Sequence, residues 1–220
     1  DMLPEQMRAE TAEKLVENIK SYGMHLSTGF LGTPYLTDVL TRFGKSDIAY
    51  KLLLQETFPS WLYPVKMGAT TIWERWGGIR PDSTFEPASM NSFNHYAYGA
   101  IGDWMYRRMA GIDNDGSSVA YKRIKIQPCL GEGFTQAGAS LKTYYGMVSN
   151  SWKIDGKNLQ MITEVPVNTS AVIYVPSKNT ISINGKPIDE SMGLKYLRTE
   201  NGSSVFEAGS GKYVFETELN

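Results

Sequence analysis

Apolar residues recur every three to four positions through the first hundred residues, which is the period of an amphipathic helix. The earliest such segment begins at Pro4, which suits a first helical turn, and ends at Gly23, which suits a helix stop. Within it, Leu15, Ile19 and Tyr22 fall on one side. This segment predicts a helix with those three side chains turned inward.

Three further segments have the same period and are separated by short loops with glycine or proline. We predict helices at Thr33–Gly44, from Ser46 or Asp47 through the following leucines, and from Ser89 or Asn91 to Met109, with Gly111 as the stop. Their inward residues are expected to be Leu36, Val39, Leu40, Phe43, Ile48, Leu52, Ile101, Trp104 and Met105. Successive helices joined in this way are typical of an all-α unit.

The period changes to two after the segment 111–118, and short runs then alternate between apolar and polar residues. Asp155-Gly156 and Asn184-Gly185 each stand between two such runs, which predicts two hairpins. Two more runs flank Gly209 and Gly211, and we expect them to pair as well. Roughly eight short strands result, which favours an antiparallel β-sandwich. We predict the domain boundary near residues 113–118.

The charge and the cysteine content limit the classes of partner and the crosslinks that are possible. The chain has 22 basic and 23 acidic residues with no block of one sign, which argues against nucleic acid or an anionic membrane as the main partner. No apolar run approaches the roughly 20 residues of a membrane-spanning helix, and none resembles a signal peptide. Cys129 is the single cysteine, so the chain forms no internal disulfide and cysteine usage does not indicate a compartment.

Several common types of site have no motif in this sequence. A phosphate-binding loop and a CxxC pair are both missing, and His25 and His95 stand too far apart for a compact metal-ligand cluster. The stretch 131–138, "GEGFTQAG", resembles a nucleotide loop, but its third glycine is misplaced and no helix is predicted after it. We therefore predict neither a metal site nor a cofactor.

The stretch "GATTIWERWGG" combines aromatic rings with charge, since Glu74 and Arg75 lie between Trp73 and Trp76. Flat aromatic faces pack against the C–H faces of sugars, and hydrolysis of a glycosidic bond requires carboxyl groups. Burial among rings would favour the protonated form of Glu74, whereas Arg75 would favour the charged form that a water-activating base needs. The stretch therefore predicts a sugar-binding pocket that contains a catalytic carboxylate.

A structural interpretation of the same residues stays open. A Trp-x-x-Trp pattern is also common in helix cores, and a Glu-Arg pair is often only solvated. The residues alone do not decide between these interpretations of Glu74, and His95 could equally be a hydrogen-bonded core histidine. Trp104 and Trp152 are expected in the core of a helix and of a strand, respectively.

Longer segments of the sequence resemble one enzyme family. They are "STGFLGTPYLTDVLTRFGKSDIAYKLLLQETFPSWLYPVKMGATTIWERW", "SMNSFNHYAYGAIGDWMYRRMAGI" and "IKIQPCLGEGFTQAGASLKTYYGMVSNSW" leading to "VPVNTSAVIYVPS". These segments resemble the C-terminal part of bacterial α-L-rhamnosidases of glycoside hydrolase family 78. The resemblance implies an (α/α)6 barrel followed by a β-sandwich, and hydrolysis of terminal α-L-rhamnose from glycosides with inversion.

The resemblance also implies roles for individual residues. The glutamate of the family motif IWERW activates the attacking water, which makes Glu74 the general base. The histidine of NHYAYG lines the sugar subsite, which assigns His95 to substrate binding. Trp73 is expected in the pocket wall, with Arg75 and Trp76 as supporting residues.

One part of the family pattern is missing. The general acid of the family is a glutamate in an earlier segment of the type D-G-x-x-R-E-R, and nothing similar occurs here. Asp38, Asp82, Glu86 and Asp103 remain in the helical half, but no motif identifies any of them as the acid. The chain also opens at Asp1 without an initiator methionine. This favours a piece of a longer protein, and a processed mature N-terminus is the alternative.

We therefore expect a C-terminal fragment, with a partial (α/α)6 barrel in residues 1–113 and an accessory β-sandwich in residues 118–220. Its partners would be rhamnose-containing glycosides or polysaccharides, and the apolar faces of an incomplete barrel would favour a homodimer. The alternative is a non-catalytic module that binds carbohydrate or has a structural role. For the sandwich we favour the structural role, because no cluster of aromatics with polar partners stands out there.

Overall fold

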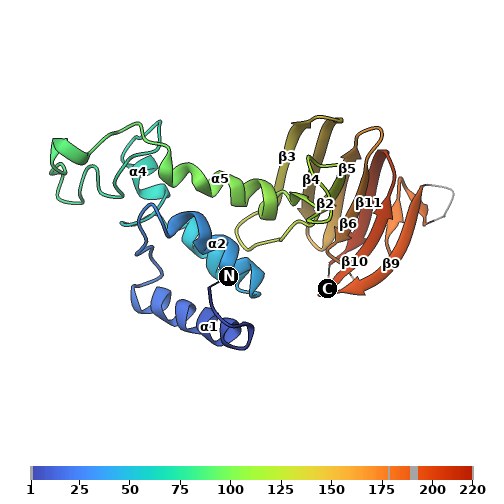
Figure 1. The fold of residues 1–220 in the computed structure, drawn as a ribbon, viewed down its shortest axis with the longest axis horizontal. Coiled ribbons are helices and arrows are strands. Elements are labelled where there is room, and N and C mark those ends of the chain that lie inside the picture. The colour runs from blue at the N-terminus through green and yellow to red at the C-terminus, as the bar shows by residue number, and fades with distance from the viewer. Residues whose placement is uncertain (1, 178, 189–192, 220) are drawn as a thin grey trace. The chain divides into compact units, whose positions relative to one another are not determined.

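The computed structural model describes residues 2–177, 179–188 and 193–219 (Figure 1). Helices occupy the first half of the chain. The α-helices are α1 (Glu5–Ser21), α2 (Thr33–Arg42), α3 (Ser46–Leu53), α4 (Leu62–Lys66) and α5 (Ile101–Trp104). Two 3-10 helices, η1 (Ala88–Met90) and η2 (Ala97–Ala100), and a π-helical turn, η3 (Met105–Met109), complete the set among the described residues.

Strands occupy the second half and form two sheets. The first sheet has the order β1-β2-β6-β10-β9, with β1 (Ile112–Asn114), β2 (Arg123–Ile126), β6 (Ser170–Val175), β10 (Ser203–Ala208) and β9 (Leu194–Glu200). The second has the order β3-β4-β5-β11-β7-β8, with β3 (Gln136–Thr143), β4 (Gly146–Asp155), β5 (Asn158–Val165), β11 (Gly211–Glu218), β7 (Ser182–Ile183) and β8 (Lys186–Pro187). Every strand pair in the described part of the chain is antiparallel except β2 with β6. A helical part followed by a β-sandwich confirms the predicted fold class.

The residues fall into two units by their internal contacts. One unit comprises residues 1–104 with 131–133, and the other comprises residues 105–130 with 134–220. The domain boundary near residues 113–118 stays a prediction. No helix in the described part of the chain has both the length and the apolar character needed to cross a membrane.

The first helix confirms its predicted ends, and of its three predicted inward residues Ile19 is buried, Leu15 is half-buried and Tyr22 is exposed. It follows Pro4 directly, and Gly23 behind it has a φ of +65°, a left-handed conformation that glycine adopts without strain. Its buried residues are Ala12, Val16 and Ile19. Tyr22 is 59% exposed, so its prediction as an inward residue is wrong. Tyr22 lies past the end of α1, where the helical period no longer determines which way a side chain points.

The last predicted helix is much shorter than expected. Apart from the brief η1, the chain is irregular up to Ala97, so a start at Ser89 or Asn91 is wrong. The backbone N–H groups of Ser92 and His95 are used elsewhere, because they donate to the Glu74 carboxylate and to the Ile72 carbonyl. An N–H group with such a partner does not join a helical ladder. Trp104, in contrast, is buried as predicted, at 2% exposure.

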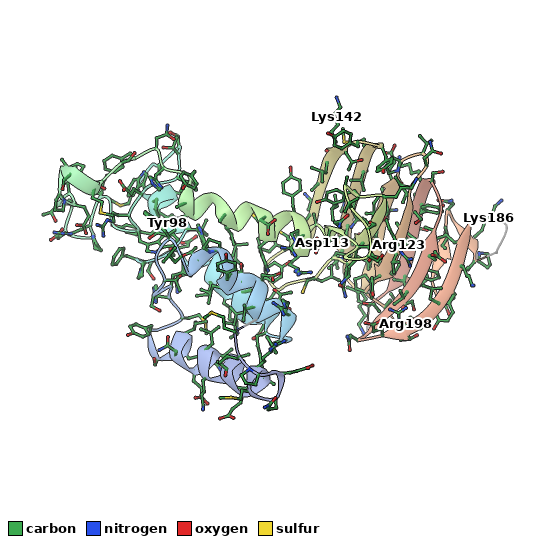
Figure 2. All side chains as sticks on the ribbon, viewed as in Figure 1. Tyr98, Asp113, Arg123, Lys142, Lys186 and Arg198 are labelled. Carbon is green, nitrogen blue, oxygen red and sulfur yellow. The ribbon has the colours of Figure 1, made fainter. Side chains whose placement is uncertain are left out.

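The sandwich core lies between the two sheets. Its largest fully buried side chains include Trp152, which confirms the predicted core position, as well as Phe206 and Phe215. The rings of Phe206 on β10 and Phe215 on β11 lie 5.9 Å apart, so they join the two sheets. Lys142 on β3 and Lys186 on β8 are exposed, and Figure 2 shows both side chains pointing away from the ribbon.

Two of the three predicted hairpins are present. Asp155-Gly156 joins β4 to β5, and Asn184-Gly185 joins β7 to β8, as predicted. The runs on either side of Gly209 and Gly211 do not pair, because β10 belongs to the first sheet and β11 to the second. This connection therefore crosses between the sheets. The hairpin that β10 does form, with β9, turns at Asn201-Gly202.

Candidate active site

The predicted site residues lie in an irregular segment between α4 and η2. Two stretches of this segment run side by side. The Glu74 N–H donates to the Ser92 carbonyl at 2.8 Å, and the His95 N–H donates to the Ile72 carbonyl at 2.8 Å. Backbone pairing therefore places the stretch that carries Glu74 beside the stretch that carries His95, although the two residues are far apart in the sequence.

The Glu74 side chain is half-buried and is held by one hydrogen bond. Its Oε2 accepts from the Ser92 backbone N–H at 2.8 Å. Its other oxygen, Oε1, has no hydrogen-bond partner within the described part of the chain. One carboxylate oxygen is thus fixed in position while the second remains available to accept a hydrogen bond from water. Ser92 was not identified from the sequence, although it lies two residues before the NHYAYG motif.

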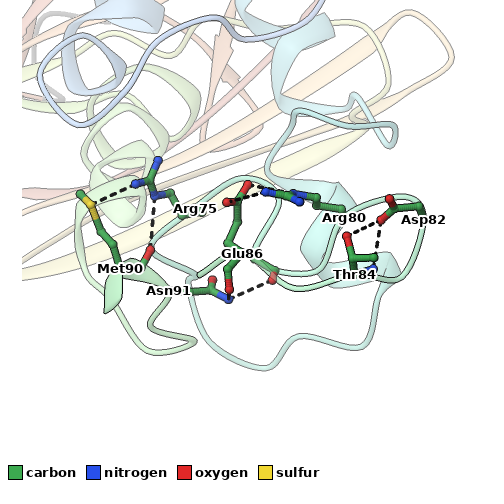
Figure 3. Close-up of polar contacts among 8 residues, drawn as sticks. Arg75, Arg80, Asp82, Thr84, Glu86, Met90 and Asn91 are labelled. Atoms are coloured by element: carbon green, nitrogen blue, oxygen red, sulfur yellow. Dashed lines mark hydrogen bonds and ion pairs between the residues drawn. The ribbon is translucent and has the colours of Figure 1, made fainter. Parts of the chain in front are cut away.

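Arg75 does not pair with its neighbour Glu74. Its Nε donates to the Met90 carbonyl at 3.3 Å, and its Nη2 contacts the Met90 sulfur at 3.0 Å (Figure 3). The exposed guanidinium therefore links two stretches of the loop. Its charge is also one of the lesser causes that lower the pKa of Glu86.

The two tryptophans on either side of Glu74 are part of the packing of this segment. Trp73 is 5% exposed, and its ring meets the ring of Phe93 edge to face at 5.0 Å. The ring of Trp76 stacks on Tyr98 at 3.7 Å, and its indole N–H donates to the Thr28 carbonyl at 3.0 Å. Burial raises the pKa of the Tyr98 phenol. These contacts favour the packing interpretation for both tryptophans, with Glu74 held between them.

His95 lies in a stack of three rings. The rings of Phe30 and Tyr96 lie 4.9 Å and 5.1 Å from it, each tilted by 13°. Its Nδ1 accepts from the Ala97 N–H at 3.3 Å, so the neutral ring carries its proton on Nε2. The imidazole is therefore oriented, with Nε2–H as its remaining donor. Phe30 could not have been identified from the sequence, because it precedes α2 and no local signal connects it to His95.

A small hairpin-like turn at residues 80–86 stabilises the same loop (Figure 3). The Arg80 guanidinium forms a two-pronged ion pair with Glu86, at 3.2 Å and 2.9 Å. This hydrogen-bonded pair lowers the pKa of Glu86 and raises that of Arg80. Hydrogen bonds from the Thr84 hydroxyl and N–H likewise lower the pKa of Asp82. The Asn91 amide donates to the carbonyls of Gly78 and Glu86, which fastens this turn to the stretch that carries Ser92.

The stability of this turn should depend on pH. The pKa of Glu86 and that of Asp82 are both lower in the folded chain than in an unfolded one, so their contribution is present above the unfolded pKa and is lost as the pH falls through the folded pKa. We expect the turn to loosen below about pH 4. NMR order parameters of the Ile79 and Thr84 amides, followed from about pH 6 to about pH 3, measure this. Glu86→Gln should loosen the turn already at the higher pH. The control for Glu86→Gln is Glu17→Gln, on the exposed side of α1. Order parameters that stay constant over this pH range would contradict the expectation.

Comparison with known proteins identifies the family. The family model described as the bacterial alpha-L-rhamnosidase 6 hairpin glycosidase domain matches residues 1–109, and that of the bacterial alpha-L-rhamnosidase C-terminal domain matches residues 111–187. An α-L-rhamnosidase of Streptomyces avermitilis is 42% identical over 215 residues, covering 98% of this chain and 20% of that protein. One from Formosa agariphila is 41% identical over 222 residues, covering 100% of this chain and 24% of that protein.

Solved structures agree with the sequence comparison. The crystal structure of the Streptomyces avermitilis α-L-rhamnosidase complexed with L-rhamnose has a TM-score of 0.91 at 41% identity, covering 98% of this chain and 20% of that one. The α-L-rhamnosidase from Aspergillus terreus has a TM-score of 0.81 at 33% identity, covering 99% and 22%. The chain thus spans only about a fifth of the length of these relatives. It belongs to the bacterial α-L-rhamnosidase family, with residues of the six-hairpin glycosidase domain followed by residues of the C-terminal domain.

Proposed function

We propose that this chain carries the general base of an inverting glycoside hydrolase that releases terminal α-L-rhamnose from glycosides. The observation that supports this is the carboxylate of Glu74, which is half-buried, held through Oε2 by the Ser92 N–H and open at Oε1. In the proposed step, Oε1 takes a proton from a water molecule while the water oxygen bonds to the anomeric carbon. The glycosidic bond breaks, and the leaving oxygen takes a proton from a separate acid.

The other predicted site residues receive roles that follow from their contacts. His95, oriented by its ring stack, would donate from Nε2 to a sugar hydroxyl. Trp73, Trp76 and Arg75 would hold the loop in the shape that presents Glu74, and Trp73, the residue expected in the pocket wall, would do so by packing against Phe93. The complementary acid must lie about 6.5–9.5 Å from Glu74 on the opposite side of the bond. We propose that this acid lies in a part of the barrel outside these residues.

The isolated chain should therefore release no rhamnose from an aryl α-L-rhamnoside. A chimera supplies the missing part: this chain replaces the matching fifth of the Streptomyces avermitilis α-L-rhamnosidase, to which it is 42% identical. We expect the chimera to hydrolyse the same substrate, measured by release of the aryl alcohol. Turnover by the isolated chain that Glu74→Gln abolishes would show that an acid lies within these residues. A folded chimera that binds rhamnose but does not hydrolyse the substrate would contradict the proposed role of this chain.

We further propose that the isolated chain self-associates through its helical unit. Large apolar side chains are exposed there, among them Leu31 at 89%, Tyr35 at 70% and Val65 at 58%. Exposed apolar area of this kind drives association. Light scattering should give a mass above that of one chain, and replacement of Leu31 and Tyr35 by serine should lower it. A monodisperse monomer that is stable for days would contradict this proposal.

A further inference from the structure

The outer face of the six-stranded sheet carries an open groove. One cavity there has a volume of about 560 Å³, and a second has about 430 Å³. Lys153 and Gln160 line both cavities, so the two form one continuous depression, which we call the sheet groove. Gln136 lines it toward β3, and Glu216 and Ser182 line it toward β7.

Strand register shows that the sheet groove runs across the strands. Gln136 pairs with Lys153, Lys153 with Gln160, Gln160 with Glu216, and Glu216 with Ser182. Directly paired residues point to the same side of a sheet, so these five side chains form one row over β3, β4, β5, β11 and β7. Neighbouring strands lie about 4.8 Å apart, so the row spans roughly 19 Å. Figure 1 shows β3, β4, β5 and β11 side by side.

The row offers both donors and acceptors from side chains. Gln160 donates to Glu216 at 3.0 Å, which fixes both groups in the middle of the sheet groove. Lys153 is exposed and forms no ion pair with any described residue, so its ammonium remains available. The backbone groups of the central strands are already paired within the sheet. A ligand here must therefore be recognised by side chains alone.

The side-chain row of the sheet groove favours some classes of ligand over others. A bound peptide would leave its own backbone groups unpaired here, since peptides that add to sheets need an open edge. The carboxylates of Asp155, Glu216 and Glu218 outnumber the single ammonium of Lys153, which disfavours nucleic acid and acidic polysaccharides. A neutral molecule with many hydroxyl groups satisfies both constraints, because each hydroxyl both donates and accepts.

The floor of the sheet groove also suits a flat, ring-shaped ligand. Gly138 lines it, and a Cβ at this position would lie 2.8 Å from the Ser151 Cβ, so a side chain here would displace its neighbour. Next to these small residues lies the half-buried aliphatic side chain of Ile162. The C–H face of a sugar ring can pack against such a surface while its hydroxyls reach the polar row.

We propose that the sheet groove binds a neutral oligosaccharide of several sugar units. The sandwich would then hold a glycan on this face independently of hydrolysis. The sequence alone favours a structural role for the sandwich, because no cluster of aromatics with polar partners stands out in this part of the chain. The register of the strands instead assembles amide, ammonium, carboxylate and hydroxyl groups from five strands into one row, which no local sequence pattern reveals.

NMR titration of the isotope-labelled chain tests this proposal directly. The probes are neutral tetrasaccharides of α-L-rhamnose, β-glucose and β-galactose, with tetragalacturonate as the acidic comparison. We expect at least one neutral probe, at millimolar concentration, to move the amide signals of the row from Gln136 to Ser182 in a saturable way. The double variant Gln160→Ala/Glu216→Ala should weaken that binding about tenfold, as the loss of one or two net hydrogen bonds predicts.

Glu164→Ala is the matched control. Glu164 lies on β5, four positions from Gln160 and on the same outer face, but it lines neither cavity. Binding should survive this substitution unchanged. The proposal is overturned if no neutral probe moves the row, if tetragalacturonate binds as well as the neutral probes, or if the control weakens binding as much as the double variant. Signals that move only around Glu74 would report the proposed active site and would equally overturn it.

Discussion

Replacing Glu74 by glutamine in the chimera is expected to lower kcat for an aryl α-L-rhamnoside by about 10²–10⁴-fold. Glutamine has the shape of glutamate, and its amide oxygen can still accept the hydrogen bond that the Ser92 N–H now donates to Oε2. The loop should therefore keep its conformation. The neutral amide cannot take a proton from water, so the attack on the anomeric carbon loses its base. Because binding of the sugar does not need this proton transfer, KM should change little.

The control is the same substitution at Glu17, which lies on the exposed side of α1 and far in sequence from the loop that carries Glu74. Its kcat should match that of the unsubstituted chimera. A fall of less than about tenfold for Glu74→Gln would contradict the assignment of Glu74 as the base. A rise in KM at unchanged kcat would instead make Glu74 a sugar-binding residue.

Gly111→Val should strongly destabilise the unit that comprises residues 105–130 and 134–220. Gly111 follows η3 with a φ of +85°, and its carbonyl accepts from the Gln127 N–H at 2.8 Å. A Cβ at this position would lie 2.3 Å from the Pro128 nitrogen and 2.6 Å from the Gln127 carbonyl carbon. Both are backbone atoms, which cannot rotate away. Left-handed strain and overpacking together should lower the free energy of unfolding by about 2–6 kcal/mol.

Urea unfolding of the 220-residue chain, followed by circular dichroism, measures this loss. Gly116→Val is the matched control, because a Cβ there meets nothing within 4 Å and the position has no left-handed φ. Its unfolding free energy should stay within about 0.5 kcal/mol of the unsubstituted chain. Gly111→Ala should show the same direction as Gly111→Val if the valine variant cannot be purified. Equal midpoints for the Gly111 and Gly116 variants would refute the steric argument.

Local signals in the sequence predicted local structure well. Pro4 and Gly23 delimit α1, and the turn residues at Asp155-Gly156 and Asn184-Gly185 form hairpins. In each case the residues that decide the conformation are adjacent in the chain. The same kind of signal at Gly209 and Gly211 was misleading, because a turn specifies a change of direction and not the strand that will be the partner.

The candidate site shows the same limit. The IWERW and NHYAYG motifs identified Glu74 and His95 as candidate site residues, but some of the groups that contact them lie outside these motifs. The Ser92 N–H reaches Glu74 from a stretch that the helical period had assigned to a helix, and Phe30 reaches His95 from before α2. Such pairings depend on how an irregular loop folds back on itself. Neither the hydrophobic period nor the residue types of a sequence predict how such a loop folds.

The position of β11 has a consequence for how the protein is made. Translation produces β11 after both of its neighbours, β5 and β7. Until it emerges, each of those strands presents an unpaired edge, and such edges invite pairing with other chains. Among the described strands, moreover, β11 is the only neighbour of the β7–β8 hairpin in its sheet. The nascent sandwich is therefore vulnerable to aggregation until β11 has been synthesised, and premature termination before Gly211 would release a chain that cannot close its second sheet.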